Sequence, residues 1–377
     1  MIYFNNAATS YPKPEGTAQA MGKCLAEPPS NLYRENVTQK SSITGCREKI
    51  AKLFHFADPA RVVFCSGATE ALNIAVNGLA PEGGRVVTTI LEHNAVLRPL
   101  YYLRSSGVIK LDIVPCRPPG DLAIGRLEKA LPEDTRLVVV NHVSNVTGAE
   151  LDIAEIYRVC ESREIPLVID ASQSAGAIEC DFSSMPLAAA AFTGHKALLG
   201  PKGVGGLIVG DQLDLRVWKS GGTGIRSDSE SMPEAWPVKY EAGTLNEPGI
   251  AGLEYSVDFI LARGISSFQK ERMDLTRHLV AELERMEAVT IYSEQPEKNH
   301  CGIVCFNIND WPAADVGYIL KDAFDIRVRT GLHCAPLIHK AMGTFPGGAI
   351  RVSFSASNHH GEVETFIRAL RTITGKT

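Results

Sequence analysis

Short apolar runs alternate with amphipathic stretches along residues 61–210 of the chain. β-branched residues dominate the apolar runs, which therefore predict buried strands. The predicted strands lie at residues 61–64, 85–89, 108–114, 137–140 and 166–169. The stretches between them repeat apolar positions at helical spacing, at residues 69–79, 94–105 and 152–164. This alternation predicts an α/β fold with a mainly parallel sheet that is covered by helices on both faces.

The pattern changes after this segment. Residues 219–250 are polar and rich in Gly and Ser, which predicts long loops. Helical spacing resumes at about residue 249 and continues to 286; a strand follows at 302–308, and a final helix begins near 361. A chain of 377 residues exceeds the usual size of one domain, so we expect a large lobe and a smaller α+β lobe.

Composition and charge narrow the function classes. The net charge of -5, without clustered Lys and Arg, argues against a nucleic-acid partner. The N-terminal residues lack the pattern of a secretory signal, and the longest apolar stretch, at 187–192, is too short to span a bilayer. We therefore expect a cytoplasmic protein without a membrane partner, whose nine cysteines are reduced thiols. Cys301 and Cys305 alternate on one face of a predicted strand, which favours core packing over a metal site.

Polar residues that follow the strands are the candidates for function, because ligands bind at the carboxyl ends of parallel strands. Residues 66–69 follow a strand and open a helix, where N–H groups and the Thr69 hydroxyl can bind a phosphate. They are equally suited to capping that helix. Asp170 closes a buried strand, and its charge calls for a cation, such as a protonated pyridine nitrogen. A cap on the next turn is the alternative.

Lys196 is the candidate nucleophile. It follows an apolar stretch and precedes a Gly-rich turn, a setting in which desolvation can activate an amine for Schiff-base formation, although most lysines are surface residues. The glycines at 200–206 match neither a P-loop nor a dinucleotide fingerprint. His93 and Asn145 follow two other strands; His93 is suited to stacking on a ring and Asn145 to donating to a phenolic oxygen, or each is simply a polar loop residue.

Taken in order, these segments resemble the class V aminotransferase-like pyridoxal-phosphate (PLP) family of fold type I. The shared segments are Ser-Gly-Ala-Thr, Glu-His, Asn-His-Val-Ser-Asn, Asp-x-x-Gln and Thr-Gly-His-Lys, and the resemblance covers nearly the whole chain. It implies a large PLP-binding domain at residues 12–248 and a small domain at residues 249–377 that also includes residues 1–11.

The resemblance also implies the roles of individual residues. Lys196 would hold PLP covalently, Asp170 would pair with the pyridine nitrogen, and His93 would stack on the ring. Asn145 and Gln173 would contact the ring oxygen. The phosphate would be held by Ala68, Thr69, Thr193 and His195. Thr244 would reach the phosphate of a neighbouring subunit, which implies a homodimer.

The reaction is indicated by a segment of the smaller lobe. Residues 327–336 resemble the Arg-Thr-Gly-His-His-Cys-Ala loop of group II cysteine desulfurases, the SufS-like and selenocysteine-lyase-like branch. Cys334 matches the cysteine that takes up sulfur from L-cysteine as a persulfide, and its cationic neighbours favour a thiolate. Arg351 matches the arginine that binds the substrate carboxylate. The implied products are L-alanine and sulfur for an acceptor protein.

Two positions depart from this pattern. An Arg-Gly-x-His element is reduced to Arg34, which is assigned to substrate binding, and Leu332 replaces the first His of the cysteine loop. Substrate identity is therefore less determined than cofactor identity. Alternatives are a selenocysteine lyase, a C–S lyase, or an aminotransferase- or epimerase-like enzyme. A thiol carrier without catalytic activity is the alternative that is not an enzyme.

Overall fold

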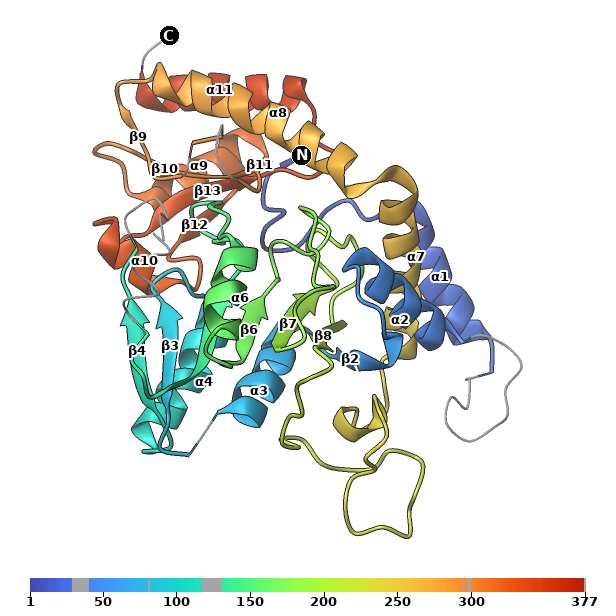
Figure 1. Cartoon of the computed structure of the whole chain (residues 1–377). Coiled ribbons are helices and arrows are strands. Elements are labelled where there is room, and N and C mark those ends of the chain that lie inside the picture. Colours follow the sequence, from blue (N-terminus) through green and yellow to red (C-terminus); the bar gives the residue numbers. More distant parts are fainter. Residues whose placement is uncertain (29–40, 81, 117–130, 294, 297–299, 376–377) are drawn as a thin grey trace.

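A seven-stranded sheet forms the centre of the chain in a computed structural model, which describes residues 1–28, 41–80, 82–116, 131–293, 295–296 and 300–375 (Figure 1). Its spatial order is β2-β8-β7-β6-β5-β3-β4. The strands are β2 (Val62–Cys65), β3 (Arg85–Thr89), β4 (Lys110–Val114), β5 (Thr135–Asn141), β6 (Leu167–Asp170), β7 (Ala188–Thr193) and β8 (Gly205–Val209). All neighbouring pairs are parallel except those of β8, which is antiparallel to both β7 and β2. The predicted, mainly parallel sheet is confirmed.

Alternating side chains place apolar residues on both faces of this sheet. Along β5, Leu137 and Val139 belong to one buried cluster, whereas Val138 and Val140 belong to the other. Helices α3 (Ala68–Leu79) and α4 (Asn94–Ser105) cover the first face. The second is covered by α2 (Ser42–Leu53), α6 (Ile153–Glu161) and α7 (Glu247–Arg263), and α1 (Glu15–Ala26) packs on α7. The sheet therefore has the two-sided cover that its near-continuous apolar strands require.

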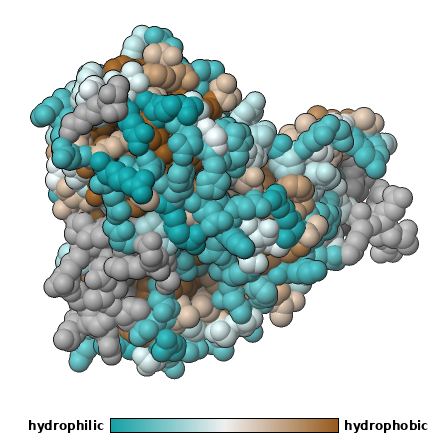
Figure 2. Space-filling view, turned by 90° about the horizontal axis from the view of Figure 1, so that it is seen from above, coloured by the Kyte–Doolittle hydropathy of each residue, from teal (hydrophilic) through white to brown (hydrophobic). Residues whose placement is uncertain are grey.

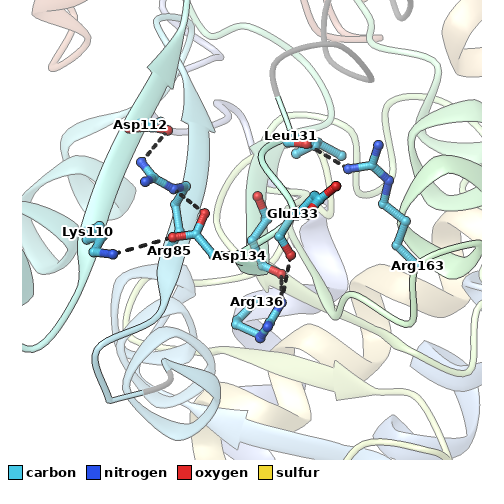
Figure 3. Close-up of polar contacts among 9 residues, drawn as sticks. Arg85, Lys110, Asp112, Leu131, Glu133, Asp134, Arg136 and Arg163 are labelled. Carbon is cyan, nitrogen blue, oxygen red and sulfur yellow. Dashed lines mark hydrogen bonds and ion pairs between the residues drawn. The ribbon is translucent and has the colours of Figure 1, made fainter.

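The amino-terminal ends of β3, β4 and β5 are joined by ion pairs (Figure 3). Arg85 at the start of β3 contacts Asp112 of β4 at 2.7 Å and Asp134, which precedes β5, at 2.8 Å. Lys110 lies 3.5 Å from Asp134. These charges lie at the edge opposite the carboxyl ends of the parallel strands, so they leave that end open for a site.

A smaller lobe is built on a second sheet of order β12-β13-β10-β9. Its strands are β9 (Val289–Ile291), β10 (Ile303–Ile308), β12 (Arg329–Gly331) and β13 (Ala349–Ser353). The helices beside it are α8 (Ile265–Glu284), α9 (Ala313–Phe324), α10 (Pro336–Ala341) and α11 (His360–Thr374). α8 and α11 lie side by side over this sheet (Figure 1). Seen from above the view of Figure 1, hydrophilic residues cover most of the surface and hydrophobic ones form scattered groups (Figure 2). None of the helices in the described ranges is both long and apolar enough to cross a membrane.

The first ten residues connect the two lobes. β1 (Ile2–Tyr3) pairs in parallel with β11 (Ile326–Arg327), and Asn5 forms a bridge with Ser353 of β13. The backbone N–H of Ser10 then donates to the carbonyl of His195, at 2.9 Å. The segment thus runs from the small lobe to the turn that carries Lys196.

Candidate active site

Polar side chains from four strand ends converge on one cavity of about 1370 Å³, a volume that includes its open mouth. His93 follows β3 and begins α4 as its N-cap, and Asn145 follows β5. Asp170 is the last residue of β6, and Thr193 is the last of β7. The cavity also receives Ala68, Thr69, Gln173, His195, Lys196, Cys334 and Arg351. The structure therefore brings together the candidate residues of both lobes, apart from two.

Those two are Thr244 and Arg34. Thr244 is exposed and lies outside the lining of this cavity. Arg34 lies outside the described residues.

One end of the cavity is formed by the N-terminus of α3. Ala68 is the first residue of this helix, whose leading N–H groups lack helical partners and favour an anion. A Cβ on Gly205 of the adjacent strand β8 would lie 2.7 Å from the Gly67 Cα and 2.5 Å from the Phe192 carbonyl oxygen. Glycine at 205 is thus what allows the turn before α3 to lie so close to β8. The Nδ1 of His195 is buried and has no partner among the described atoms, and burial lowers the pKa of this imidazole to about 4, so the ring is neutral at neutral pH.

Asp170 and Lys196 are two oppositely charged residues of the cavity. One carboxylate oxygen of Asp170 accepts from the N–H of Ser172 at 2.9 Å, which fixes the side chain at the strand end. Desolvation, opposed by Asp170 and aided by the nearby Arg351, lowers the pKa of Lys196 to about 8. A lysine in this state has a substantial neutral fraction near neutral pH, which a nucleophilic amine requires.

His93 is held as a neutral ring. Its Nδ1 accepts from the N–H of Ala95 at 3.0 Å, so the proton of the neutral imidazole lies on Nε2. Desolvation, with Lys196 nearby, lowers the pKa of His93. A neutral, capped imidazole beside the cavity is suited to packing against an aromatic ring.

The residue before it, Glu92, is a fully buried carboxyl group. Its Oε1 accepts from the Thr89 hydroxyl at 2.7 Å and from the N–H of Asn141 at 3.1 Å, whereas Oε2 has no partner among the described atoms. Burial raises the pKa of Glu92 to about 8, and the charge of Asp170 adds to this shift. Glu92 is therefore mostly protonated at neutral pH, and the sequence interpretation did not single it out.

Asn145 and Gln173 approach the cavity as buried amides. The Nδ2 of Asn145 donates to the carbonyl of His333 at 2.7 Å, and its Oδ1 has no described partner. The Nε2 of Gln173 donates to the carbonyl of Ala7 at 3.0 Å. The two amides thus contact the cysteine loop and the N-terminal segment, respectively.

The small lobe contributes a thiol and a buried guanidinium. Cys334 is the exposed cysteine among the nine, and it lines the cavity together with Lys196. Arg351 of β13 is 3% exposed; its Nη1 donates to the carbonyl of Asn145 at 2.9 Å, while its Nε has no described partner. Desolvation lowers the pKa of Arg351 to about 10. None of the described carboxylates pairs with it, so its charge is available to a carboxylate ligand.

Three charged lining residues were missed by the sequence interpretation: Glu70, Lys202 and Arg329. Arg329 of β12 lies directly opposite Arg351 in the register of the antiparallel pair. Glu70 accepts from the N–H and the hydroxyl of Ser66 at 2.8 and 2.7 Å, beside the N-terminus of α3. The signal for Arg329 was its spacing: it lies five residues before Cys334, in the same loop segment.

Comparisons with known proteins agree on the family. The model of the class V aminotransferases matches residues 2–366. The chain is 33% identical to a probable cysteine desulfurase of Methanothermobacter thermautotrophicus, over 99% of this chain and 95% of that protein. It is 31% identical to a cysteine desulfurase of Shigella flexneri, over 99% and 93%. The apo structure of a cysteine desulfurase from Thermococcus onnurineus superposes with a TM-score of 0.87 at 29% identity, over 99% and 94%.

Proposed function

The chain belongs to the class V aminotransferase family, and from this premise we infer that it is a cysteine desulfurase that works with pyridoxal phosphate. The observation that carries this conclusion is the convergence on one cavity of an amine, a carboxylate, a thiol and a guanidinium that none of the described carboxylates pairs with. They belong to Lys196, Asp170, Cys334 and Arg351. A transaminase has no need of the thiol, whereas a desulfurase does.

The polar atoms of the cavity fit this cofactor. Buried polar atoms without partners are rare, and among the described residues four of them belong to residues that line the cavity: His195 Nδ1, Asn141 Oδ1, Asn145 Oδ1 and Arg351 Nε. Ala68, Thr69, Thr193 and His195 would hold the phosphate at the N-terminus of α3. Asp170 would pair with the pyridine nitrogen, His93 would stack on the ring, Gln173 and Asn145 would contact its oxygen, and Lys196 would hold it covalently.

When bound, the cofactor supplies an electron sink for the charge left at the substrate Cα. Arg351 binds the carboxylate of L-cysteine through paired N–H donors, which orients the amino acid. The amine of Lys196, with its pKa of about 8, exchanges a proton at Cα.

Cys334 receives the sulfur. Its thiolate bonds to the substrate sulfur as the Cβ–S bond breaks, the electron pair of that bond stays with Cβ, and protonation yields L-alanine. The Cys334 persulfide then passes its outer sulfur to an acceptor thiol. The exposure of Cys334 supports this last transfer.

The test is to incubate the PLP-loaded protein with L-cysteine and a reductant and to assay sulfide and alanine together. We expect equal amounts of both from the natural chain. Cys334→Ser should keep the PLP absorbance band and lose sulfide release. Full turnover by the Ser variant would refute the role of Cys334. If L-selenocysteine or a thioether amino acid were turned over faster than L-cysteine, that compound would be assigned as the substrate instead.

We also propose the higher-order features of the enzyme. Thr244 is exposed and outside its own cavity, which supports its reaching the phosphate of a second copy in a homodimer. The domains would be residues 12–248 and residues 249–377 with 1–11, and α7, which packs on α1 and α2, lies at their boundary. Arg34 would contact substrate, and the cytoplasm is the proposed location.

A further inference from the structure

The loop that carries Cys334 has an unusual backbone. His333 and Cys334 have φ angles of 49° and 59°, and both lie in the left-handed region that residues other than glycine rarely adopt. Two such residues in succession persist only where the surrounding structure holds them. What holds this pair therefore determines where the thiol points.

The carbonyl groups of the pair are fixed from the large lobe. The Nδ2 of Asn145 donates to the His333 carbonyl at 2.7 Å, and the N–H of Asn94, the first residue of α4, donates to the Cys334 carbonyl at 2.7 Å. Both bonds fix the backbone of the loop. Neither fixes the His333 side chain, which is 7% exposed and itself lines the cavity.

That side chain belongs to a buried chain of hydrogen bonds. The Nδ1 of His333 lies 3.3 Å from the Nε2 of His339 in α10, and the Nδ1 of His339 lies 2.7 Å from the Thr344 hydroxyl. At the other end, the Nε2 of His333 lies 3.4 Å from the carbonyl oxygen of Arg329. His339 is fully buried and Thr344 is 8% exposed.

Only one order of protons satisfies this chain. A carbonyl oxygen can only accept, so His333 must carry its proton on Nε2 and accept on Nδ1. His339 must then donate from Nε2 and accept on Nδ1, and the Thr344 hydroxyl must donate to it. The hydroxyl also lies 3.3 Å from the His339 carbonyl, but donating there would reverse both rings and set an unprotonated Nε2 against the Arg329 carbonyl.

We propose that His339 and Thr344 are positioning residues for Cys334. The one-way chain from Thr344 through His339 and His333 to Arg329 locks the His333 ring and so aims the thiol into the cavity. This inference rests on the proposed function, because it gives the hydrogen-bond chain a role in the step in which Cys334 takes up sulfur. Both rings are neutral at neutral pH, since burial lowers the pKa of His339 to about 4 and that of His333 well below its usual range.

The test compares Thr344→Val, which keeps the shape and removes the donor, with Thr344→Ser, which keeps the donor. Thr372→Val is the matched control, because Thr372 is an exposed threonine of α11. In the PLP-loaded Val variant at position 344 we expect desulfuration of L-cysteine to fall roughly tenfold or more, since small misplacements of reacting groups have effects of this size. The Ser variant and the control should stay within about twofold of the natural chain.

A second readout separates positioning from general damage. Exchange of the Cα hydrogen of L-alanine in D₂O uses Lys196 and the cofactor but not the thiol, so it should be unchanged in Thr344→Val. Equal loss of exchange and desulfuration, or no loss of desulfuration, would overturn the proposal. If the natural chain does not desulfurate, the proposed function fails. The rate at which iodoacetamide labels Cys334 then still tests the role of the hydrogen-bond chain, and this rate should differ between the Val and Ser variants.

A third readout needs no variant. In protein labelled with ¹⁵N-histidine, long-range ¹H–¹⁵N spectra distinguish the tautomers of the ten histidines. We expect His333 and His339 to be neutral with the proton on Nε2 at about pH 6, where an ordinary histidine is largely protonated. A charged ring or a proton on Nδ1 of either residue at this pH would contradict the proton order.

Discussion

Replacing Glu92 with Gln should stabilise the cofactor-free protein, and the gain should grow with pH. Gln imitates the protonated carboxyl group and keeps the acceptor for Thr89 and Asn141. Glu92 has its pKa raised by burial from 4.5 to about 8, so the unfolded chain loses this proton more readily than the folded one. The stabilising effect of the protonated form is complete below about pH 4.5 and is lost as the pH rises towards about 8.

The size of the effect follows from the shift. Each pKa unit corresponds to about 1.4 kcal/mol, so the shift from 4.5 to about 8 makes the natural chain less stable by about 4 kcal/mol at pH 8 and less than about 1 kcal/mol at pH 5. For a chain of 377 residues, this predicts a rise of about 5 °C in the unfolding temperature of Glu92→Gln at pH 8 and about 1 °C at pH 5.

The assay is thermal unfolding of the natural chain and the variant at both pH values and equal protein concentration. Glu133→Gln, at an exposed position, is the matched control and should show no such trend. Any constant cost of placing an amide group at Oε2 cancels in the comparison of the two pH values. A difference between Glu92→Gln and the natural chain that does not change with pH would refute the reasoning.

Two further predictions concern the buried charges. Glu241→Gln removes the carboxylate that lies 2.6 Å from the buried Arg47 guanidinium, so the free energy of unfolding, measured in urea, should fall by about 3 kcal/mol; an unchanged value would mean that Arg47 is compensated elsewhere. The rate at which the cofactor-free protein takes up PLP, followed by absorbance, should rise with pH and level off above about 8, because only the neutral amine of Lys196 reacts. A rate that still climbs at pH 10 would imply an ordinary lysine pKa of about 10.4.

Periodicity predicted the elements whose residues have strong intrinsic preferences. The helix expected at residues 94–105 is α4 with the same bounds, and the strands expected at 85–89 and 302–308 match β3 and β10 closely. β7 and β8 were not predicted as strands, because β7 begins with four alanines and β8 with two glycines, residues that do not favour strands. They form strands through pairing with their neighbours, and a Cβ at Gly205 or Gly206 of β8 would lie 2.5 Å from a carbonyl oxygen of an adjacent strand.

The site was predicted where residues follow strands, because the parallel sheet brings those positions to one edge. Asp170, Thr193 and Lys196 lie in the cavity for this reason. Arg329 and the buried chain through His339 and Thr344 depend on the pairing of β12 with β13 and on the packing of α10, which the sequence does not reveal. Glu92 was missed because its raised pKa comes from burial, which its position in the sequence does not reveal.

The N-terminal segment acts as a strap between the lobes. It is anchored on β11 at Tyr3 and on the carbonyl of His195 at Ser10, and the residues between them are also fixed to Ser353. Tyr3 and Ser10 are only seven positions apart, so a rotation of the small lobe would be transmitted through this segment to the turn that carries Lys196. Removing the first ten residues would take away this connection between the lobe that carries the Cys334 thiol and the turn that carries the Lys196 amine. Every side chain that lines the cavity except those of Ala7 and Ala8 would remain.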